Sequence, residues 1–178
     1  MRKILTLIFL LAVAAGLQAS GVVFPSRFDD ISASASEKYD VDPALVKAVI
    51  YRESRFQPNA KGTRGEIGLM QLRKSVVKDW VKAHSYGHQP TEEELFDPYM
   101  NIMIGVWRLG IALKRWRGRS TSIGLALFDY NAGKSCVATW IVHYDGDTKA
   151  VIDRGPSAAY IREIMGNFAA ASSGKGLK

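Results

Sequence analysis

Glu53 is the residue of this sequence whose type and position best suit acid–base chemistry. It follows Val49 by four residues and Ile50 by three, in a segment whose apolar residues recur with helical spacing. A carboxyl group on the core-facing side of a helix is partly desolvated, which raises its pKa, and the negative end of the helix dipole acts in the same direction. Such an acid can still hold a proton near neutral pH and donate it to a leaving group. The same position also suits a rim residue paired with Arg52 or Arg55, and periodicity alone favours neither interpretation.

Two further segments carry groups that could bind a polar ligand. Residues 65–71 read GEIGLMQ, and the two glycines permit a tight turn that brings the backbone close to a ligand. The amide of Gln71 can donate and accept hydrogen bonds, for example with sugar hydroxyls or an acetamido group. Residues 128–133 read FDYNAG and offer the flat face and phenol of Tyr130. Taken alone, each segment also fits a loop before a helix or a helix C-terminus.

The elements that must position these groups are predicted to be helices. Asp42-Pro43 and Asp97-Pro98 each place an N-cap residue before a proline at the first helical position, and Thr91 begins a capping-box pattern. No long alternating strand pattern and no internal repeat is present. We expect helices over residues 28–39, 42–54, 71–84, 97–117, 120–130, 136–144 and 156–165, a short helix after Thr91, and a loop over 56–67. The fold class is therefore one mainly α domain.

The first nineteen residues have the layout of a secretory signal peptide. Arg2 and Lys3 precede an apolar run over residues 4–15, and small residues surround a cleavage point after Ala19. The run is too short to span a bilayer, and no cysteine follows it that could carry a lipid. A buried N-terminal helix or a short anchor is the alternative. We predict an exported protein, periplasmic or secreted, without an integral membrane segment after cleavage, and divide it into a signal peptide (1–19), one domain (20–168) and a flexible tail (169–178).

Charge and cysteine content limit the partners. The formal net charge of +7 falls to +5 without Arg2 and Lys3, which favours polyanions such as an anionic wall. The basic residues are spread along the chain, and the cluster over 115–119 is interpreted as the solvated end of a helix, so no nucleic-acid partner is expected. Cys136 is the only cysteine and has no neighbouring histidine, which predicts a small buried hydrophobe and no internal disulfide.

Other chemical signals in the chain are weak. His84 and His88 are four residues apart, but Gly87 lies between them and no glutamate follows His84, so no metal site is predicted. His143 is isolated, and no Gly-x-Ser-x-Gly motif is present to support Ser-His-Asp chemistry. The chain has four tryptophans, at Trp80, Trp107, Trp116 and Trp140. They could stack on sugars, but most of them are expected in the core. No cofactor is expected.

Taken together and in this order, the segments resemble the three signature blocks of the soluble lytic transglycosylase family. The blocks are Glu53-Ser54, GLMQ at 68–71 and YNAG at 130–133. The resemblance covers roughly residues 41–164. It extends to Asp42-Pro43, Phe56-Gln57-Pro58, Asp97-Pro98, Asn101-Ile102 and Tyr160-Ile161-Arg162.

The resemblance implies a lysozyme-like domain of the goose-type or SLT kind, with a groove between lobes and at most a very small β element. It implies that Glu53 protonates the bond between N-acetylmuramic acid and N-acetylglucosamine in peptidoglycan glycan strands. The muramoyl C6 hydroxyl then closes a 1,6-anhydro ring. The implied substrate-binding residues are Ser54, which orients the muramoyl group, Gly68, Leu69, Met70 and Gln71, which line the sugar site, Tyr130 and Asn131, which position Glu53 and the substrate, and Tyr160. A monomer without metal or cofactor is expected.

The sequence departs from the family pattern at three places. Glu66 and Asp129 stand where small residues are usual, and either could be the second carboxylate that a hydrolytic muramidase needs. We expect both to be solvated. The proline that often follows the second block is absent after Gln71, which leaves the local loop path open.

Several alternatives stay open at this point. One is a true muramidase, and another is a wall-binding component of a secretion or conjugation machine that has lost activity. Glu53, Gln71 and Tyr130 argue against the second, because a pure binder need not keep the acid. The sequence does not separate wall turnover, service to a secretion or conjugation machine, and a phage role.

Overall fold

The computed structural model describes residues 26–173, so the predicted signal peptide lies outside the described residues, as do residues 174–178. The described part is built of helices, and its β structure is limited to isolated antiparallel bridges that join Ile67 to Lys61 and to Leu72. The mainly α fold class is confirmed. No described helix has the length and apolar character that crossing a membrane requires. The elements are η1 (Ser26–Phe28), α1 (Asp29–Tyr39), α2 (Pro43–Ser54), α3 (Lys74–His84), α4 (Glu92–Phe96), α5 (Pro98–Trp116), α6 (Ser122–Ala132), α7 (Lys134–His143), α8 (Thr148–Arg154) and α9 (Ala158–Ser172).

The predicted helix starts are confirmed at three caps. The Asp42 side chain accepts a hydrogen bond from the Ala44 N–H, and Asp97 accepts one from the Met100 N–H. Thr91 and Glu94 form a complete capping box at the start of α4. Each cap satisfies backbone donors that have no partner inside the helix.

The observed helices differ from the prediction at several places, and both ends of α6 and the start of α9 are shifted by two residues. Helix α3 begins at Lys74 and not at Gln71, because Gln71 has a φ of 47° and the bridge between Ile67 and Leu72 holds this stretch in a turn. Helix α7 begins two residues early, at Lys134. Helix α8 was not predicted, although Asp147 accepts hydrogen bonds from two N–H groups of its first turn. Helix α9 continues to Ser172, so residues 169–172 of the predicted tail are helical.

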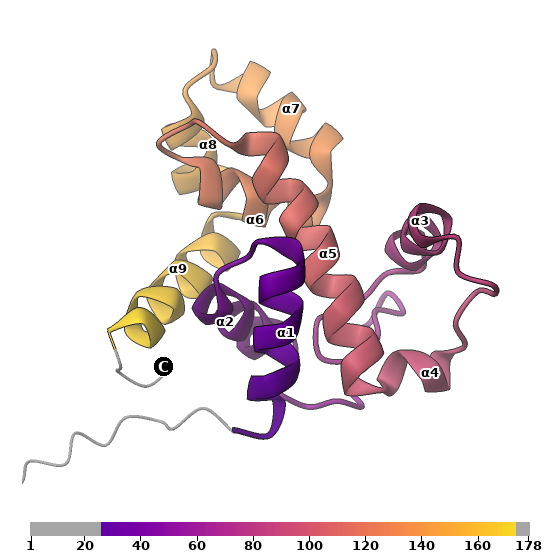
Figure 1. Ribbon diagram of the computed structural model, residues 1–178. Coiled ribbons are helices and arrows are strands. Elements are labelled where there is room, and N and C mark those ends of the chain that lie inside the picture. Colours follow the sequence, from indigo (N-terminus) through magenta and orange to yellow (C-terminus); the bar gives the residue numbers. More distant parts are fainter. Residues whose placement is uncertain (1–25, 174–178) are drawn as a thin grey trace, which may run out of the picture.

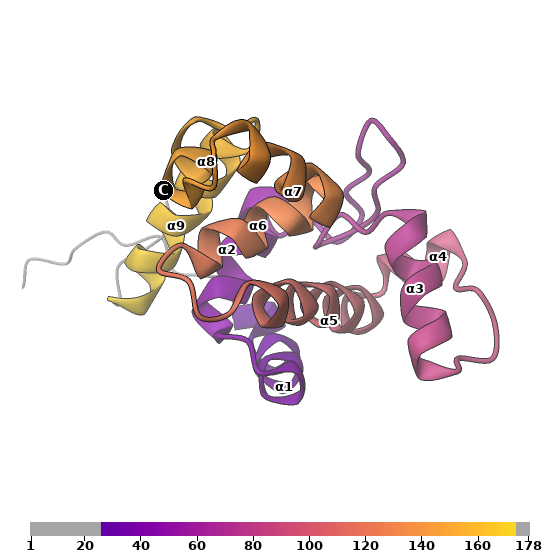
Figure 2. The same ribbon diagram turned by 90° about the horizontal axis from the view of Figure 1, so that it is seen from above.

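Helix α5 runs through the middle of the molecule (Figure 1) and packs against α1, α3, α4 and α6. Helices α3 and α4 lie near one end of α5, whereas α8 and α9 lie toward the other (Figures 1 and 2). Helix α2, which carries Glu53, packs against α9 and α1. The side chains at these contacts are apolar and almost completely excluded from water, which is the main source of stability of the fold. They include Leu45, Ile50, Ile102, Ile104, Leu109, Leu125, Phe128 and Ile164.

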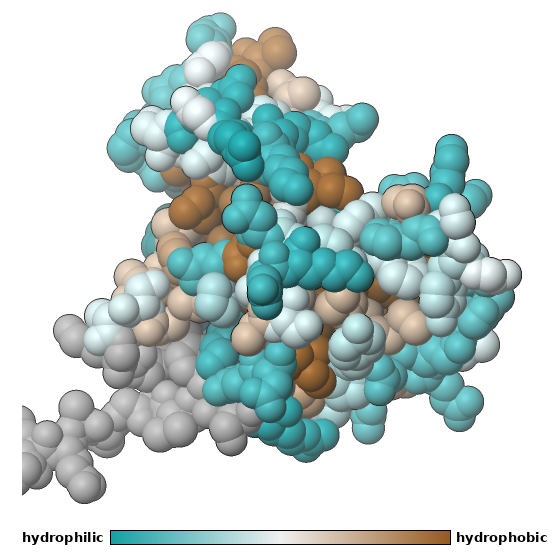
Figure 3. Space-filling view, viewed as in Figure 1, coloured by the Kyte–Doolittle hydropathy of each residue, from teal (hydrophilic) through white to brown (hydrophobic). Residues whose placement is uncertain are grey.

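The surface seen in Figure 3 is mostly hydrophilic, with hydrophobic patches at the waist between α6–α8 and the rest of the molecule and smaller ones above and below it. The exposed large apolar side chains of the described part are Tyr99 and Val142. Isolated exposed apolar residues of this kind are normal on protein surfaces.

Candidate active site

Glu53 lies half-buried in the last turn of α2, and its partner comes from the far end of the chain. The Tyr160 hydroxyl on α9 donates a hydrogen bond of 2.6 Å to Glu53 Oε1. Arg52 and Arg55 instead pair with Glu163, at 2.8 and 2.9 Å. The alternative in which Glu53 is a rim residue paired with one of these arginines is therefore wrong.

The surroundings of Glu53 raise its pKa above the ordinary value of a glutamic acid. Burial is the largest cause, because it disfavours the charged form, and the nearby charge of Glu66 adds to it. The hydrogen bond from Tyr160 and the charges of Arg52 and Arg73 act in the opposite direction but are weaker. The carboxyl group thus resembles the half-desolvated acids that deliver protons in glycosidases.

A tight loop over residues 67–71 faces Glu53, and the buried amide of Asn101 on α5 organises it. Asn101 accepts a hydrogen bond of 2.8 Å from the Met70 N–H and donates to the carbonyls of Ile67 (2.9 Å) and Leu95 (2.7 Å). Gly68 has a φ of 76°, and a Cβ there would lie 2.2 Å from Asn101 Nδ2. Only glycine fits this approach.

Two hydroxyl groups hold the same loop from other helices. Ser54 donates to the carbonyls of Leu69 (2.8 Å) and Ile50 (3.1 Å), and its side chain is buried. Tyr130 on α6 donates to the Met70 carbonyl at 2.8 Å. Helices α2, α5 and α6 therefore converge on this loop, and the loop is fixed relative to Glu53.

A small cavity of about 110 Å³ opens beside Glu53. Four of the predicted site residues line it, namely Glu53, Gln71, Tyr130 and Asn131, and they are joined there by Glu66, Leu72, Arg73, Val76 and Arg108. The other predicted residues lie behind the cavity wall: Ser54, Gly68, Leu69, Met70 and Tyr160 are buried and are not among the lining residues. The sequence thus predicted both the residues that line the cavity and the buried residues behind its wall, but it did not separate the two groups.

Two amide side chains of the cavity have fixed orientations. Gln71 Nε2 donates to the carbonyls of Gly68 (2.9 Å) and Ala60 (3.2 Å), and Asn131 Nδ2 donates to the Ser157 hydroxyl at 2.9 Å. Since each amide uses its NH₂ group on the protein, its oxygen remains as an acceptor for a ligand.

The small cavity continues into a larger one of about 570 Å³, with which it shares Arg73, Val76, Arg108 and Tyr130. Residues of α3 form one wall and the α6–α7 junction forms the other. Helix α5 supplies the floor through Trp107, Arg108, Ile111 and Arg115. The two cavities together are a groove that runs past Glu53.

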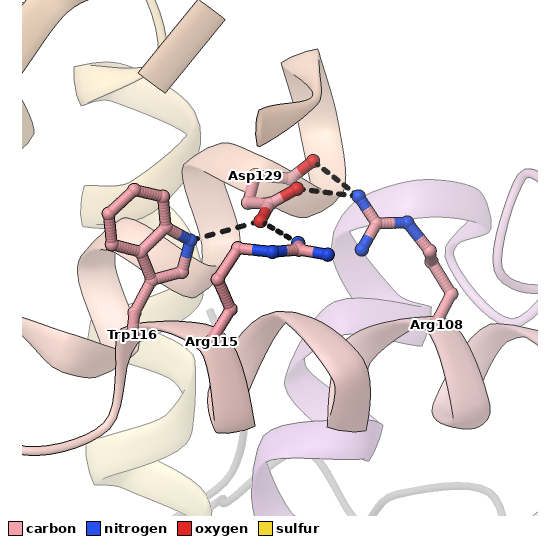
Figure 4. Close-up of polar contacts among 4 residues, drawn as sticks. All are labelled: Arg108, Arg115, Trp116 and Asp129. Carbon is pink, nitrogen blue, oxygen red and sulfur yellow. Dashed lines mark hydrogen bonds and ion pairs between the residues drawn. The ribbon is translucent and has the colours of Figure 1, made fainter. Parts of the chain in front are cut away.

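Asp129 contradicts the expectation of a solvated carboxylate. It is fully buried, and Arg108 Nη2 donates to its Oδ1 at 2.6 Å, while Arg115 Nη1 and Trp116 Nε1 donate to its Oδ2 at 2.5 and 3.0 Å (Figure 4). Burial alone would raise the pKa of Asp129, but the hydrogen bonds and charges of these partners outweigh burial and hold the pKa below its ordinary value. With both oxygens occupied, Asp129 cannot be the second carboxylate of a glycosidase. The basic cluster over residues 115–119 was predicted to be the solvated end of a helix, but its Arg115 and Trp116 bond to the buried Asp129.

Glu66 was also expected to be solvated, but only 15% of its side chain is exposed. Its carboxylate accepts a hydrogen bond of 3.0 Å from the Arg64 N–H and lies 3.5 Å from Arg73 Nε. It lines the same small cavity as Glu53. Of the two additional acids, Glu66 is the one that shares a site with Glu53.

The remaining sequence signals lie outside the groove or on its floor. His84 contacts the Trp80 carbonyl and His88 contacts Glu94, and within residues 26–173 no three potential metal ligands come together. Trp80 and Trp116 are buried as predicted, whereas Trp107 is half-buried and faces the larger cavity. Cys136 is half-buried and unpaired.

Two curated proteins are similar in sequence to about half of this chain. Membrane-bound lytic murein transglycosylase E of Buchnera aphidicola subsp. Acyrthosiphon pisum is 36% identical over 91 residues, which are 51% of this chain and 41% of that protein. The X polypeptide of Escherichia coli is 36% identical over 103 residues, which are 56% of each. The chain spans about half the length of these curated relatives.

Solved structures share the fold at lower identity. The 70 kDa soluble lytic transglycosylase of Escherichia coli superposes with a TM-score of 0.70 at 24% identity, and a complex of the 70 kDa soluble lytic transglycosylase with bulgecin A with 0.74 at 23%. An inactive mutant of the lytic transglycosylase Slt of Pseudomonas aeruginosa gives 0.73 at 21%. These matches cover 84%, 86% and 85% of this chain and 24%, 25% and 25% of the others. The model of the transglycosylase SLT domain family matches residues 30–152, so the chain belongs to that family, as its signature blocks indicated.

Proposed function

We propose that this protein is a peptidoglycan lytic transglycosylase that cleaves the bond between N-acetylmuramic acid and N-acetylglucosamine, with Glu53 as its acid and base. The observation that carries the proposal is the half-buried carboxyl of Glu53, which has a raised pKa and lines the groove. Membership in the SLT family and the names of the relatives support the substrate class.

The chemistry needs a proton to move twice. Glu53 first donates its proton to the glycosidic oxygen as the bond to the muramoyl carbon breaks, and positive charge develops on that sugar. The C6 hydroxyl of the same sugar then attacks this carbon, and the Glu53 carboxylate takes the hydroxyl proton. The 1,6-anhydro ring closes without water, and Glu53 regains its initial protonation state. The Tyr160 hydroxyl stabilises the carboxylate between the two transfers.

A hydrolytic muramidase is the second candidate, and the position of Glu66 favours it. Enzymes that hydrolyse this type of bond use two carboxyl groups, and Glu66 lines the same cavity as Glu53. The identity of the new sugar end distinguishes the two reactions.

The proposed setting is the bacterial wall, outside the cytoplasmic membrane. The murein named in one relative and the predicted signal peptide both support export to the periplasm or beyond. We propose a monomer that binds glycan strands without metal or cofactor.

Mass spectrometry of fragments released from purified peptidoglycan tests the proposal. The wild-type protein should release muropeptides one water lighter than hydrolysis products, and Glu53→Gln should lower the rate by at least about a hundredfold, because the amide cannot donate the proton. Glu93→Gln is the matched control, since Glu93 is exposed on α4 away from the groove, and it should retain the wild-type rate.

Ordinary reducing ends would make the protein a muramidase and assign the second carboxylate to Glu66. Ordinary activity in Glu53→Gln would show that Glu53 is not the acid. Binding to peptidoglycan without any release would instead favour a wall-binding component.

A further inference from the structure

The larger cavity of the groove carries an excess of positive charge. Four cationic side chains line it, from the residue before α3, from α5 and from α7, against two acidic ones. The cations are Arg73, Arg108, Arg115 and Lys134, and the acids are Asp79 and Asp129.

The buried acid cannot neutralise both of its partners. Asp129 accepts hydrogen bonds from Arg108 and Arg115 together, so one carboxylate serves two guanidinium groups and one positive charge is left over (Figure 4). Each guanidinium has five N–H donors, and only part of them is used on Asp129. The two side chains remain 16% and 34% exposed and line the cavity, which places the surplus charge at its surface.

Lys134 adds a further cation, at the wall formed by the α6–α7 junction. It is exposed, it is the first residue of α7, and within residues 26–173 it forms no ion pair. Gly133 and Ser135 line the cavity beside it, so the positive end of the α7 dipole acts on the same space. The acid that faces this wall is Asp79 of α3, so one carboxylate stands against Lys134 and the surplus charge of the two arginines.

The floor between these charges is partly apolar. Trp107, Ile111 and Val76 line the cavity along with the cations. Apolar surface combined with fixed cations suits a chain of aliphatic and amide groups that ends in carboxylates, and suits a neutral sugar less well. The cavity adjoins the one that contains Glu53, so it lies within reach of a substituent on the sugar bound there.

We propose that this cavity binds the stem peptide of peptidoglycan and that Arg108, Arg115 and Lys134 recognise its free carboxylates. The inference rests on the proposed function and adds to it a preference for peptide-bearing over naked glycan strands. Asp129 is a positioning residue in this arrangement, because it holds the two arginines at the cavity surface.

Binding to the Glu53→Gln protein tests the inference without turnover. Three probes are compared by calorimetry: glycan strands with intact stem peptides, the same strands with their carboxylates chemically amidated, and strands from which the peptides have been removed. We expect the first probe to bind about fivefold more tightly than the other two, in line with roughly 1 kcal/mol for a partly exposed charge pair. Higher salt should reduce this advantage.

A second substitution in the same background locates the effect. Lys134→Glu should abolish the preference for the first probe. Lys82→Glu is the matched control, because Lys82 is an exposed lysine that lines neither cavity. This variant has the same net charge as Lys134→Glu and should keep the preference for the first probe.

Equal binding of the native and amidated strands would overturn the inference and leave the proposed function intact. So would an unchanged preference in the Lys134→Glu variant. Failure of the Glu53→Gln protein to bind any of the three probes, together with no fragment release by the wild type, would overturn the proposed function and the inference with it.

Discussion

The acidity of Glu53 results from a balance between burial and one hydrogen bond. Burial favours the protonated acid, and the Tyr160 hydroxyl favours the carboxylate. The pKa values of Tyr160 and Tyr130 are raised well above the ordinary value, chiefly by burial and then by the charge of Glu53, so both phenols remain protonated hydrogen-bond donors. Glu53 can therefore release its proton at the transition state and still be stabilised afterwards.

Tyr160→Phe should change both the rate and its pH dependence. Removal of the hydrogen bond that stabilises the carboxylate raises the pKa of Glu53, so the protonated acid persists further into alkaline conditions. The alkaline limb of the kcat/KM profile should move to higher pH, and kcat/KM at its optimum should fall by roughly tenfold, because a hydrogen bond to a charged group is lost. Initial rates of fragment release over a range of pH measure both effects.

Tyr130→Phe is the matched comparison for this prediction. Its hydroxyl bonds to the Met70 carbonyl and not to Glu53, so the variant should lose activity without a shift of the alkaline limb. An unshifted limb in Tyr160→Phe, or a shift to lower pH, would contradict the assigned role of Tyr160.

At the scale of elements, the site depends on how helices α2, α5 and α6 hold the loop over residues 67–71. Asn101 satisfies one N–H and two carbonyl groups that would otherwise be buried without partners. Gly105 lets α5 approach the same loop, since a Cβ there would lie 2.3 Å from the Met70 sulfur. The position of Gln71 in the groove therefore depends on residues of α5 that never contact a ligand.

Asn101→Ala should lower the free energy of unfolding by about 2–4 kcal/mol, because it leaves several buried backbone groups unpaired. Urea unfolding followed by circular dichroism measures the change. Asn59→Ala, at an exposed position, serves as the control and should stay within about 0.5 kcal/mol of the wild type. Equal effects of the two substitutions would mean that the loop does not depend on the Asn101 amide.

At the scale of the whole molecule, the buried network of Asp129 joins α6 to α5 beneath the groove. The carboxylate is needed to compensate guanidinium groups that have been partly removed from water, and its removal leaves them without a partner. The network therefore links the stability of the fold to the charge of the groove.

Asp129→Asn should destabilise the protein by roughly 3–5 kcal/mol near neutral pH. The pKa of Asp129 is lower in the folded protein than in the unfolded chain, so its contribution is fully present above the unfolded pKa and is lost as the pH falls through the folded pKa. The difference in unfolding free energy between wild type and variant should consequently shrink in acid, as urea titrations at several pH values can measure. Asp145→Asn, at an exposed position, is the control, and a difference that does not depend on pH would contradict the role of the ionised carboxylate.

The sequence by itself determined the features that depend on neighbours in the chain. The caps at Asp42, Thr91 and Asp97 follow from side chains that bond to N–H groups two or three residues away, and the helical spacing around Glu53 predicted its partial burial. The cap at Asp147 was an equally local signal that could have revealed α8. The signature blocks then predicted the family.

Tertiary structure decided which of these residues meet and what each carboxyl group does. The hydrogen bond between Tyr160 and Glu53 joins residues 107 positions apart, and the pairs of Asp129 join residues 21 and 14 positions apart. No periodicity encodes such pairs, because they depend on how α9 packs on α2 and how α6 packs on α5. Glu53, Glu66 and Asp129 are similar acids in the sequence, and only the burial, charges and donors brought to each by packing make one a proton donor, one a neighbour in the same cavity and one a buried anchor.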